Sequence, residues 1–275
     1  YADRFGYRGF RGFFYSGNDI TAIMMTLLPL CICFFMQLPR GTSRKRLIPY
    51  ATAPAFTLVA MCLIGTKTAF IGVGAAVAAP FVFALVEFFR KKDRTLLVRL
   101  AIILVIFGLT LGCLMLFASA NVLSMISESL QAAGDISERE GAATALLSGR
   151  QDKLKRAFDQ YRDGGLYCIL FGLGRGTQQY VIEMDVFEIV IYYGLFGAVA
   201  LLWLYLKLGV QFLINLFRRF DLMGLCIAVA LALCAGYLII AGHVLFSVSS
   251  GFYFALMLAI SRLYYTPQPH ELRIY

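Results

Sequence analysis

The sequence predicts an all-α membrane protein: a polytopic bundle of about seven transmembrane helices with one large, ordered loop outside the membrane. Hydrophobic residues make up 60% of the chain and charged residues only 15%, and the mean hydropathy is +0.76. The apolar residues fall into runs near the roughly 20 residues that a helix needs to cross a bilayer. One long polar segment, from Ser119 to Asp185, lies among these runs.

The apolar runs define the expected spans and divide the chain into three regions. The first four spans and an outer N-terminal loop occupy residues 1–118, the large loop occupies 119–185, and the last three spans and a tail occupy 186–275. The fifth run extends to Phe217, and Gly194 and Gly197 in its first half permit a bend or close packing. The expected spans are residues 19–38, 48–65, 69–88, 97–118, 186–208, 222–241 and 243–262.

Basic residues between the runs predict the orientation. If all seven helices span, every basic cluster falls on one side, which the positive-inside rule assigns to the cytoplasm. The N-terminal loop and the large loop then face the periplasm or exterior of a bacterial cytoplasmic (inner) membrane. The clusters are Arg40, Arg44, Lys45 and Arg46; Arg90, Lys91, Lys92 and Arg94; Arg218 and Arg219; and Arg262 and Arg273.

Composition also argues against several other classes of protein. The net charge of +9 comes mostly from these short loops, and no basic patch interleaved with aromatics indicates a nucleic-acid partner. The seven cysteines lack metal-ligand spacing and resemble small hydrophobic residues, so we expect no metal and no cofactor. The chain begins at Tyr1 without a visible signal peptide, and we expect it to be a fragment.

The large loop holds 9 of the 16 acidic residues and 7 of the 25 basic ones. Within it, Ser148 is expected to cap a helix over residues 149–162 that ends at Gly164 and Gly165. Basic residues at three-residue spacing fall roughly on one face of this helix, which is either a solvated face or part of an anion site. They are Arg150, Lys153 and Arg156.

Arg150 is the strongest candidate for binding phosphate, because an arginine fork near a helix N-terminus suits a phosphate oxygen. A solvated helical arginine is the alternative. Other cations on the expected outer side could line the same site or lie at the lipid headgroups. These are Arg8, Arg11, Arg175 and Lys67.

Candidate proton acceptors lie near the start of the fifth and seventh spans. Glu183 and Asp185 precede or begin the fifth span, where a carboxylate could orient an acceptor hydroxyl, act as a general base if its pKa is raised, or cap the helix. His243 is expected to open the last helix, as a base or as a structural hydrogen-bonding group.

The order of several short motifs resembles the C-terminal two-thirds of the O-antigen ligase and polysaccharide polymerase family. The resemblance implies a metal-independent, inverting glycosyltransferase of the GT-C type, in which arginines hold the pyrophosphate of an undecaprenyl-linked glycan. Arg150 matches the loop arginine of that family, and Arg8 or Arg11 matches the one before the first visible span. The motifs are Arg8-Gly9-Phe10-Arg11-Gly12-Phe13, Thr66-Lys67-Thr68-Ala69, Ser148-Gly149-Arg150, Phe171-Gly172-Leu173-Gly174 and Tyr193-Gly194-Leu195-Phe196-Gly197.

One departure from the family pattern separates two possible activities. Ligases of this kind usually carry a histidine just before the helix with the Gly-x-x-Gly pattern, where this chain has Glu183-Met184-Asp185. The resemblance therefore favours a polymerase of lipid-linked glycan repeat units, with an acceptor glycan or lipid and a chain-length regulator protein as partners. A ligase that transfers glycan to lipid A core, a lipid-linked glycan transporter and a structural membrane subunit are the alternatives.

Overall fold

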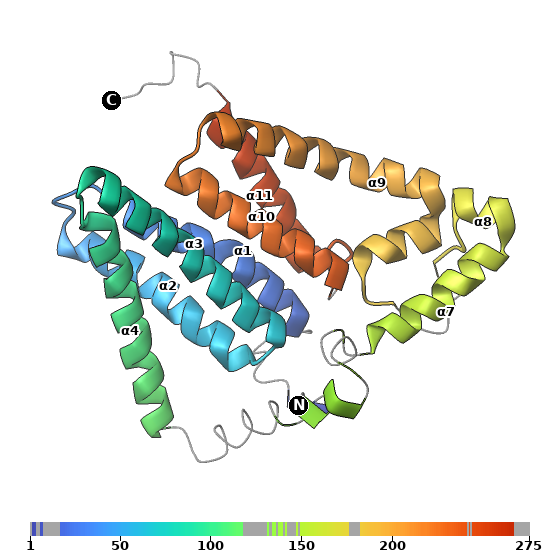
Figure 1. The fold of residues 1–275 in the computed structure, drawn as a ribbon, viewed down its shortest axis with the longest axis horizontal. Helices are drawn as coiled ribbons and strands as arrows, with labels where there is room; N and C mark the ends of the chain where they lie inside the picture. Colours follow the sequence, from blue (N-terminus) through green and yellow to red (C-terminus); the bar gives the residue numbers. More distant parts are fainter. Residues whose placement is uncertain are drawn as a thin grey trace.

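The computed structural model describes residues 17–117, 149–175, 182–240 and 244–266, together with Gly242 and a few positions among residues 2–7 and 131–147. These residues are almost entirely helical (Figure 1), so the all-α prediction is confirmed. Two short strands, β1 (Ala2–Asp3) and β2 (Gly6–Tyr7), pair with each other near the N-terminus. The helices are α1 (Gly17–Met36), α2 (Arg44–Ile64), α3 (Lys67–Lys91), α4 (Thr95–Phe117), α7 (Arg150–Asp163), α8 (Gly165–Phe171), α9 (Asp185–Arg218), α10 (Leu222–Ile240) and α11 (Val248–Tyr265).

Six helices in the described part of the chain are long and apolar enough to cross a membrane, namely α1, α2, α3, α4, α9 and α10. They match the first six expected spans, which confirms a polytopic helical membrane protein. The last helix was expected to open at residue 243, and this is wrong, because α11 begins at Val248 after a bend at residues 244–247. The backbone amides of Val244 and Leu245 bind a side chain of α9 instead of joining α11.

Helix α1 forms the centre of the bundle. It packs against α2, α3, α10 and α11, and Leu28, Ile32 and Phe35 are fully buried along its length. Helix α3 presents small residues to this core, with Ala69 and Ala76 fully buried. A Cβ at Gly72 would collide with the side chain of Met25 on α1. Small residues thus let α3 approach α1 closely, as is usual between membrane helices.

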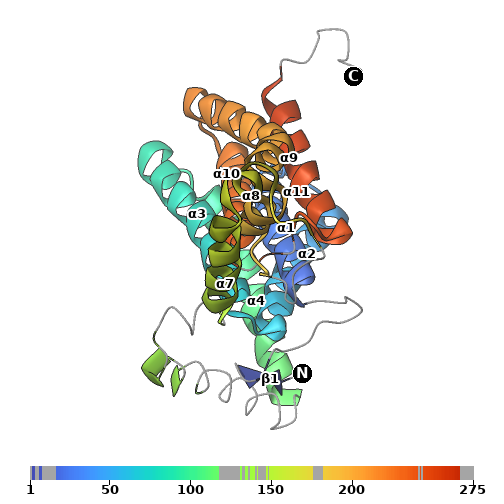
Figure 2. The ribbon, with the colours of Figure 1, turned by 90° about the vertical axis from the view of Figure 1, so that its right-hand side faces the viewer.

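The ends of the helices form two separate clusters of contacts. At the first end, which we call the basic end, the loops with the arginine and lysine clusters meet: Arg40 binds Asp93, and Tyr264 donates to Asp221. At the other end, which we call the loop end, Thr21 on α1 contacts Thr66, and Ser250 on α11 donates to Asp19. Helices α7 and α8 stand beside the start of α9, on the side that faces the viewer in Figure 2. The basic loops therefore gather at one end, as the charge pattern predicts.

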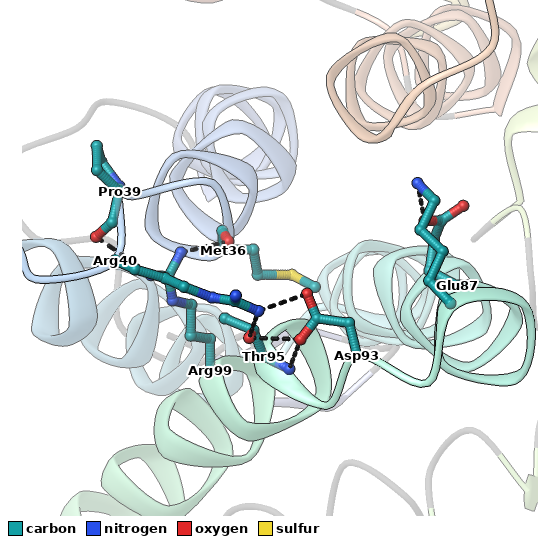
Figure 3. A network of polar contacts seen from close by, with 8 residues as sticks. Met36, Pro39, Arg40, Glu87, Asp93, Thr95 and Arg99 are labelled. Atoms are coloured by element: carbon teal, nitrogen blue, oxygen red, sulfur yellow. Dashed lines mark hydrogen bonds and ion pairs between the residues drawn. The ribbon is translucent and has the colours of Figure 1, made fainter.

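A polar network holds two of the basic loops together (Figure 3). One Nη of Arg40 donates to the carboxylate of Asp93 at 2.7 Å and to the hydroxyl of Thr95 at 2.8 Å. Arg99 on α4 donates to the carbonyl of Met36, at the end of α1, at 2.7 Å. Hydrogen bonds from Thr95, together with the charge of Arg40, hold the pKa of Asp93 below its usual range. These contacts fix the ends of α1, α3 and α4 relative to one another.

Helix α9 is broken at Gly194. This residue has φ 66° and ψ −173°, a region of backbone conformation that essentially only glycine adopts. The carbonyls of Ile191 and Tyr192, just before the break, accept hydrogen bonds from the amides of Leu173 and Gly174 at 2.9 and 3.0 Å. The expected bend in the fifth span is confirmed. A segment that follows α8 satisfies the carbonyls that the break leaves without intrahelical partners.

We expect the basic end to face the cytoplasm, which can be measured by cysteine accessibility. After replacement of the seven native cysteines, all of which are unpaired, single cysteines are placed at Ser43 and at Gln160, both exposed and uncharged. The Gln160→Cys variant should react with an impermeant thiol reagent in intact spheroplasts, and the Ser43→Cys variant should react only after lysis. The reverse pattern would overturn the orientation.

We expect alanine at Gly172 or Gly194 to destabilise the fold strongly. Both residues have positive φ. A Cβ at Gly172 would collide with the backbone of Tyr192, and a Cβ at Gly194 would collide with the backbone of Leu170. The cost should be about 1–3 kcal/mol or more from backbone strain and displacement. A thermal melt in detergent measures it, with Gly209→Ala as the control, because that Cβ on α9 meets nothing within 4 Å. Unchanged melting of both variants would contradict the described contact.

Candidate functional site

The large loop folds onto α9 through a small core of its own. Ala157 and Tyr161 on α7 pack with Ile182, Ile191 and other apolar residues at the start of α9. The hydroxyl of Tyr161 donates to the carbonyl of Ile169, which fixes α8 against α7. The expectation of an ordered loop is thus met for residues 149–175. Helix α8 was not anticipated, because a short apolar run inside a polar segment gives no clear periodicity.

The start of α7 differs in detail from the expectation. Helix α7 begins at Arg150, and Gly149 occupies the N-cap position with φ 74° and no side-chain cap. Ser148, the residue expected to cap this helix, lies outside the described residues. A left-handed glycine turns the chain into the helix at this point, so that Arg150 is the first helical residue.

Arg150, Lys153 and Glu183 form the centre of the candidate site. The Nε of Arg150 donates to one carboxylate oxygen of Glu183, and the Nζ of Lys153 donates to the other, each at 3.0 Å. The Arg150 side chain is only 8% exposed, against 41% for Lys153 and 31% for Glu183. Two cations from one helix face thus converge on the two oxygens of a single anion.

The third basic residue of that helix face, Arg156, is exposed and is not among the two cations that pair with Glu183. The sequence therefore predicted the basic face of α7, but it did not predict that this face binds Glu183. Glu183 lies 33 residues from Arg150 along the chain, and no local pattern encodes a contact over that distance. Lys153 was expected only as a member of the basic face, and its bond to Glu183 could not be predicted for the same reason.

Glu183 has an unusual backbone conformation. Its φ is 62°, which is uncommon for a residue other than glycine and costs of order 1–3 kcal/mol unless the surroundings stabilise it. Its amide donates to Glu188, a fully buried residue on α9, at 3.2 Å. A Cβ at Gly242 would collide with the Glu183 carbonyl, so the chain after α10 packs directly on this residue. Strain maintained in this way is typical of functional sites.

Electrostatics make Glu183 a poor general base. Burial alone would raise the pKa of Glu183, but the hydrogen bond from Lys153 and the charges of Arg150 and Lys153 together hold it below its usual value. The pKa of Glu183 is thus lowered and not raised, which disfavours the alternative in which Glu183 takes a proton. A carboxylate with a lowered pKa stays ionised near neutral pH, where it can orient cations or a hydroxyl group.

Asp185 is fully buried and binds the backbone that leads into α11. One of its oxygens accepts from the amides of Val244 and Leu245 at 2.6 and 2.7 Å. This geometry favours a structural role, in which Asp185 holds the connection between α10 and α11 against the start of α9. The capping alternative placed such a bond at the start of the fifth span, whereas these amides lie in the segment before α11.

Arg175 lies in the segment after α8 and stacks on an aromatic ring. Its guanidinium is 4.2 Å from the centroid of the Phe246 ring, and that ring stacks on Tyr193 with 6.4 Å between centroids. Cation–π contacts of this kind contribute about 0.5–2 kcal/mol. Arg175 therefore helps to join the loop to α9 and to the chain before α11, at the loop end of the bundle.

The structure describes the side-chain contacts of none of the remaining candidate site residues. Lys67 begins α3 beside Thr66, whose hydroxyl caps that helix, so the Lys67 backbone lies at the loop end. Arg8, Arg11 and His243 lie outside the described residues. The neighbours of His243 are informative, because Gly242 packs on Glu183 and Val244 binds Asp185. Among the described residues, no three His, Cys, Asp or Glu side chains form a group that could hold a metal ion.

Comparison with known proteins identifies the family. The family model described as O-antigen ligase like membrane protein matches residues 3–137 and 128–264, which together cover nearly the whole chain. The chain belongs to this family. No curated protein and no solved structure matches the chain. The family resemblance expected from the motifs is confirmed, and membership indicates a membrane enzyme of the glycosyl-transfer type.

The lowered pKa of Glu183 predicts how the site responds to acid. A carboxyl group whose pKa is lower in the folded than in the unfolded protein stabilises the fold above its unfolded pKa, and this stabilisation is lost as the pH falls through the folded value. The difference in melting temperature between wild type and Glu183→Gln should therefore be constant from pH 6 to 8. It should shrink below about pH 4.5, the ordinary pKa of glutamate.

The matched control for this measurement is Asp159→Asn, which removes a half-exposed carboxylate from the same helix. It should change the melting temperature little at any pH, because exposed ion pairs contribute little. A wild-type to Glu183→Gln difference that titrates between pH 6 and 8 would contradict the described ion cluster.

Proposed function

We propose that this chain is a polymerase of lipid-linked glycans, which transfers undecaprenyl-pyrophosphate-linked repeat units on the outer face of the bacterial cytoplasmic membrane. Family membership supports glycosyl transfer. The observation that carries the proposal further is the pair of cations, Arg150 and Lys153, that the fold brings together around one anion at the loop end. A pyrophosphate needs such a pair of donors, both when it binds and when it leaves.

In this proposal the donor pyrophosphate binds at Arg150 and Lys153. Arg150 uses its Nε for Glu183 and one Nη for a long contact to the carbonyl of Leu147 at 3.4 Å, and a guanidinium has five N–H donors in all. Glu183 holds both cations in position before the substrate arrives. Arg8, Arg11, Arg175 and Lys67 are proposed as further pyrophosphate ligands.

The proposed reaction is a displacement at the anomeric carbon. A hydroxyl group of the acceptor glycan attacks that carbon, its bond to the phosphate oxygen breaks, and the configuration inverts. The lipid pyrophosphate leaves as an anion, which the cations stabilise without a metal ion. The hydroxyl proton needs an acceptor, and since Glu183 has a lowered pKa and Asp185 is occupied by backbone amides, His243 is the proposed base.

A ligase is the second candidate function, favoured by the description of the matching family. The two activities differ in their acceptor and not in the donor site. A ligase would transfer the glycan to a terminal acceptor such as lipid A core. A polymerase would transfer it to another lipid-linked repeat unit.

Reconstitution in liposomes distinguishes these functions. The purified protein receives lipid-pyrophosphate-linked repeat units with no other acceptor. A ladder of lipid-linked oligomers is the result expected of a polymerase. Transfer only after a second acceptor is added would show a ligase, and movement of the glycan across the bilayer with no new glycosidic bond would show a transporter.

Replacement of Arg150 tests the donor site most sharply. Arg150→Lys keeps the charge but loses the planar fork. A hydrogen bond to a charged group contributes about 1.5–3 kcal/mol, so each one lost should slow turnover about 10- to 150-fold. The oligomer ladder measures the rate, and Arg156→Ala is the control, because that arginine is an exposed member of the same helix. Full activity of Arg150→Lys in correctly folded protein would reject the role.

A further inference from the structure

A cavity of about 410 Å³ lies between the last turns of α9 and α11, at the basic end of the bundle. The ends of α9 and α11 that border it lie away from α7 (Figure 1). Its volume is within the range of ordinary ligand sites. It is lined by Leu208, Gln211, Phe212, Ile214, Asn215, Arg218, Ser261, Arg262, Tyr265 and Thr266.

The charge of this cavity is positive and is not neutralised within the described part of the chain. Its lining includes two arginines, Arg218 and Arg262, and no acidic residue. Neither arginine side chain has an ion pair among the described residues, whereas the adjacent Arg219 pairs with Asp221 at 3.4 Å. Both are exposed at the rim, each at the end of one of the two helices. Two unpaired guanidinium groups facing one cavity indicate an anionic ligand.

The rest of the cavity lining combines the apolar residues Leu208, Phe212 and Ile214 with uncharged polar residues, and it continues onto an exposed apolar strip of α9. Phe212 is buried in its wall, whereas the α9 residues around it are exposed, among them Val210, Leu213 and Ile214. Helix α9 has the length and hydropathy of a membrane span, so this exposed strip is expected to contact acyl chains. A small soluble anion could use the arginines but would leave the apolar strip without a partner.

We propose that this cavity binds an anionic phospholipid, with the phosphate group between Arg218 and Arg262 and the acyl chains along the exposed strip of α9. Basic pockets between membrane helices commonly bind anionic lipid headgroups on the cytoplasmic side. The position of the cavity at the basic end agrees with this, because the positive-inside rule assigns that end to the cytoplasmic leaflet. The site is separate from the glycosyl-transfer site and does not depend on the proposed function.

Native mass spectrometry of the purified protein tests this proposal. Wild type is loaded with equal amounts of phosphatidylglycerol and phosphatidylcholine, and the retained lipids are counted. Wild type should retain phosphatidylglycerol preferentially. Arg218→Gln combined with Arg262→Gln should reduce this retention about tenfold or more, since each lost hydrogen bond to a charged group costs about 1.5–3 kcal/mol.

The control removes two arginines elsewhere at the basic end, Arg44→Gln with Arg46→Gln, both exposed. It should retain phosphatidylglycerol as wild type does. Equal loss in both double variants, equal retention of the two lipids, or displacement of the lipid by millimolar inorganic phosphate would each overturn the proposal, the last by indicating a site for a free anion.

A second measurement needs no substitution at all. Phosphatidylglycerol should raise the melting temperature of wild type in detergent above that found with phosphatidylcholine, because a ligand that binds the folded state stabilises it. The absence of any difference between the two lipids would count against the site even if the arginine variants failed to fold.

Discussion

The rest of this structure depends on the hydrogen bonds across the break in α9. A break in a helix leaves carbonyl groups without intrahelical partners, and each such group costs several kcal/mol in an apolar surrounding if it stays unpaired. Here the amides of Leu173 and Gly174 satisfy the carbonyls of Ile191 and Tyr192. The contact requires glycine on both sides, at Gly172 and Gly194, because any Cβ would enter the opposing backbone. The break in α9 and the fold of the large loop therefore depend on the same contact.

This contact explains why the candidate site forms where it does. The segment at residues 172–174 fixes α8, and α8 fixes α7 through Tyr161. The first turn of α7 then brings Arg150 and Lys153 to Glu183, which is held in a left-handed conformation by Glu188 and Gly242. Asp185 joins the same point to the start of α11. A shift of the loop by about 1 Å would move both cations away from Glu183, and effective catalysis depends on positions of that accuracy.

Much of the fold could be predicted from the sequence because its cause is local. A span needs only a run of apolar residues. A glycine such as Gly194 within that run permits a bend, because glycine adopts backbone conformations that other residues avoid. The pairing of Arg150 with Glu183 could not be predicted, since it depends on how the loop packs on α9. The role of Asp185 was hidden for the same reason, because its partners at residues 244 and 245 lie 59 and 60 residues away. The order of the glycine motifs along the chain indicated the family. The contact between the motifs that contain Gly172 and Gly194 could be seen only in the folded structure.

Hydrogen exchange at residues 172–174 tests the central claim directly. If the loop is docked on the broken helix, the amides of Leu173 and Gly174 are bonded to α9 and should exchange orders of magnitude more slowly than in an unstructured peptide. Their protection should be similar to that of the amides within α7. Exchange at the rate of a free loop would show that the segment does not satisfy the α9 carbonyls, and the explanation of how the site is assembled would then be wrong.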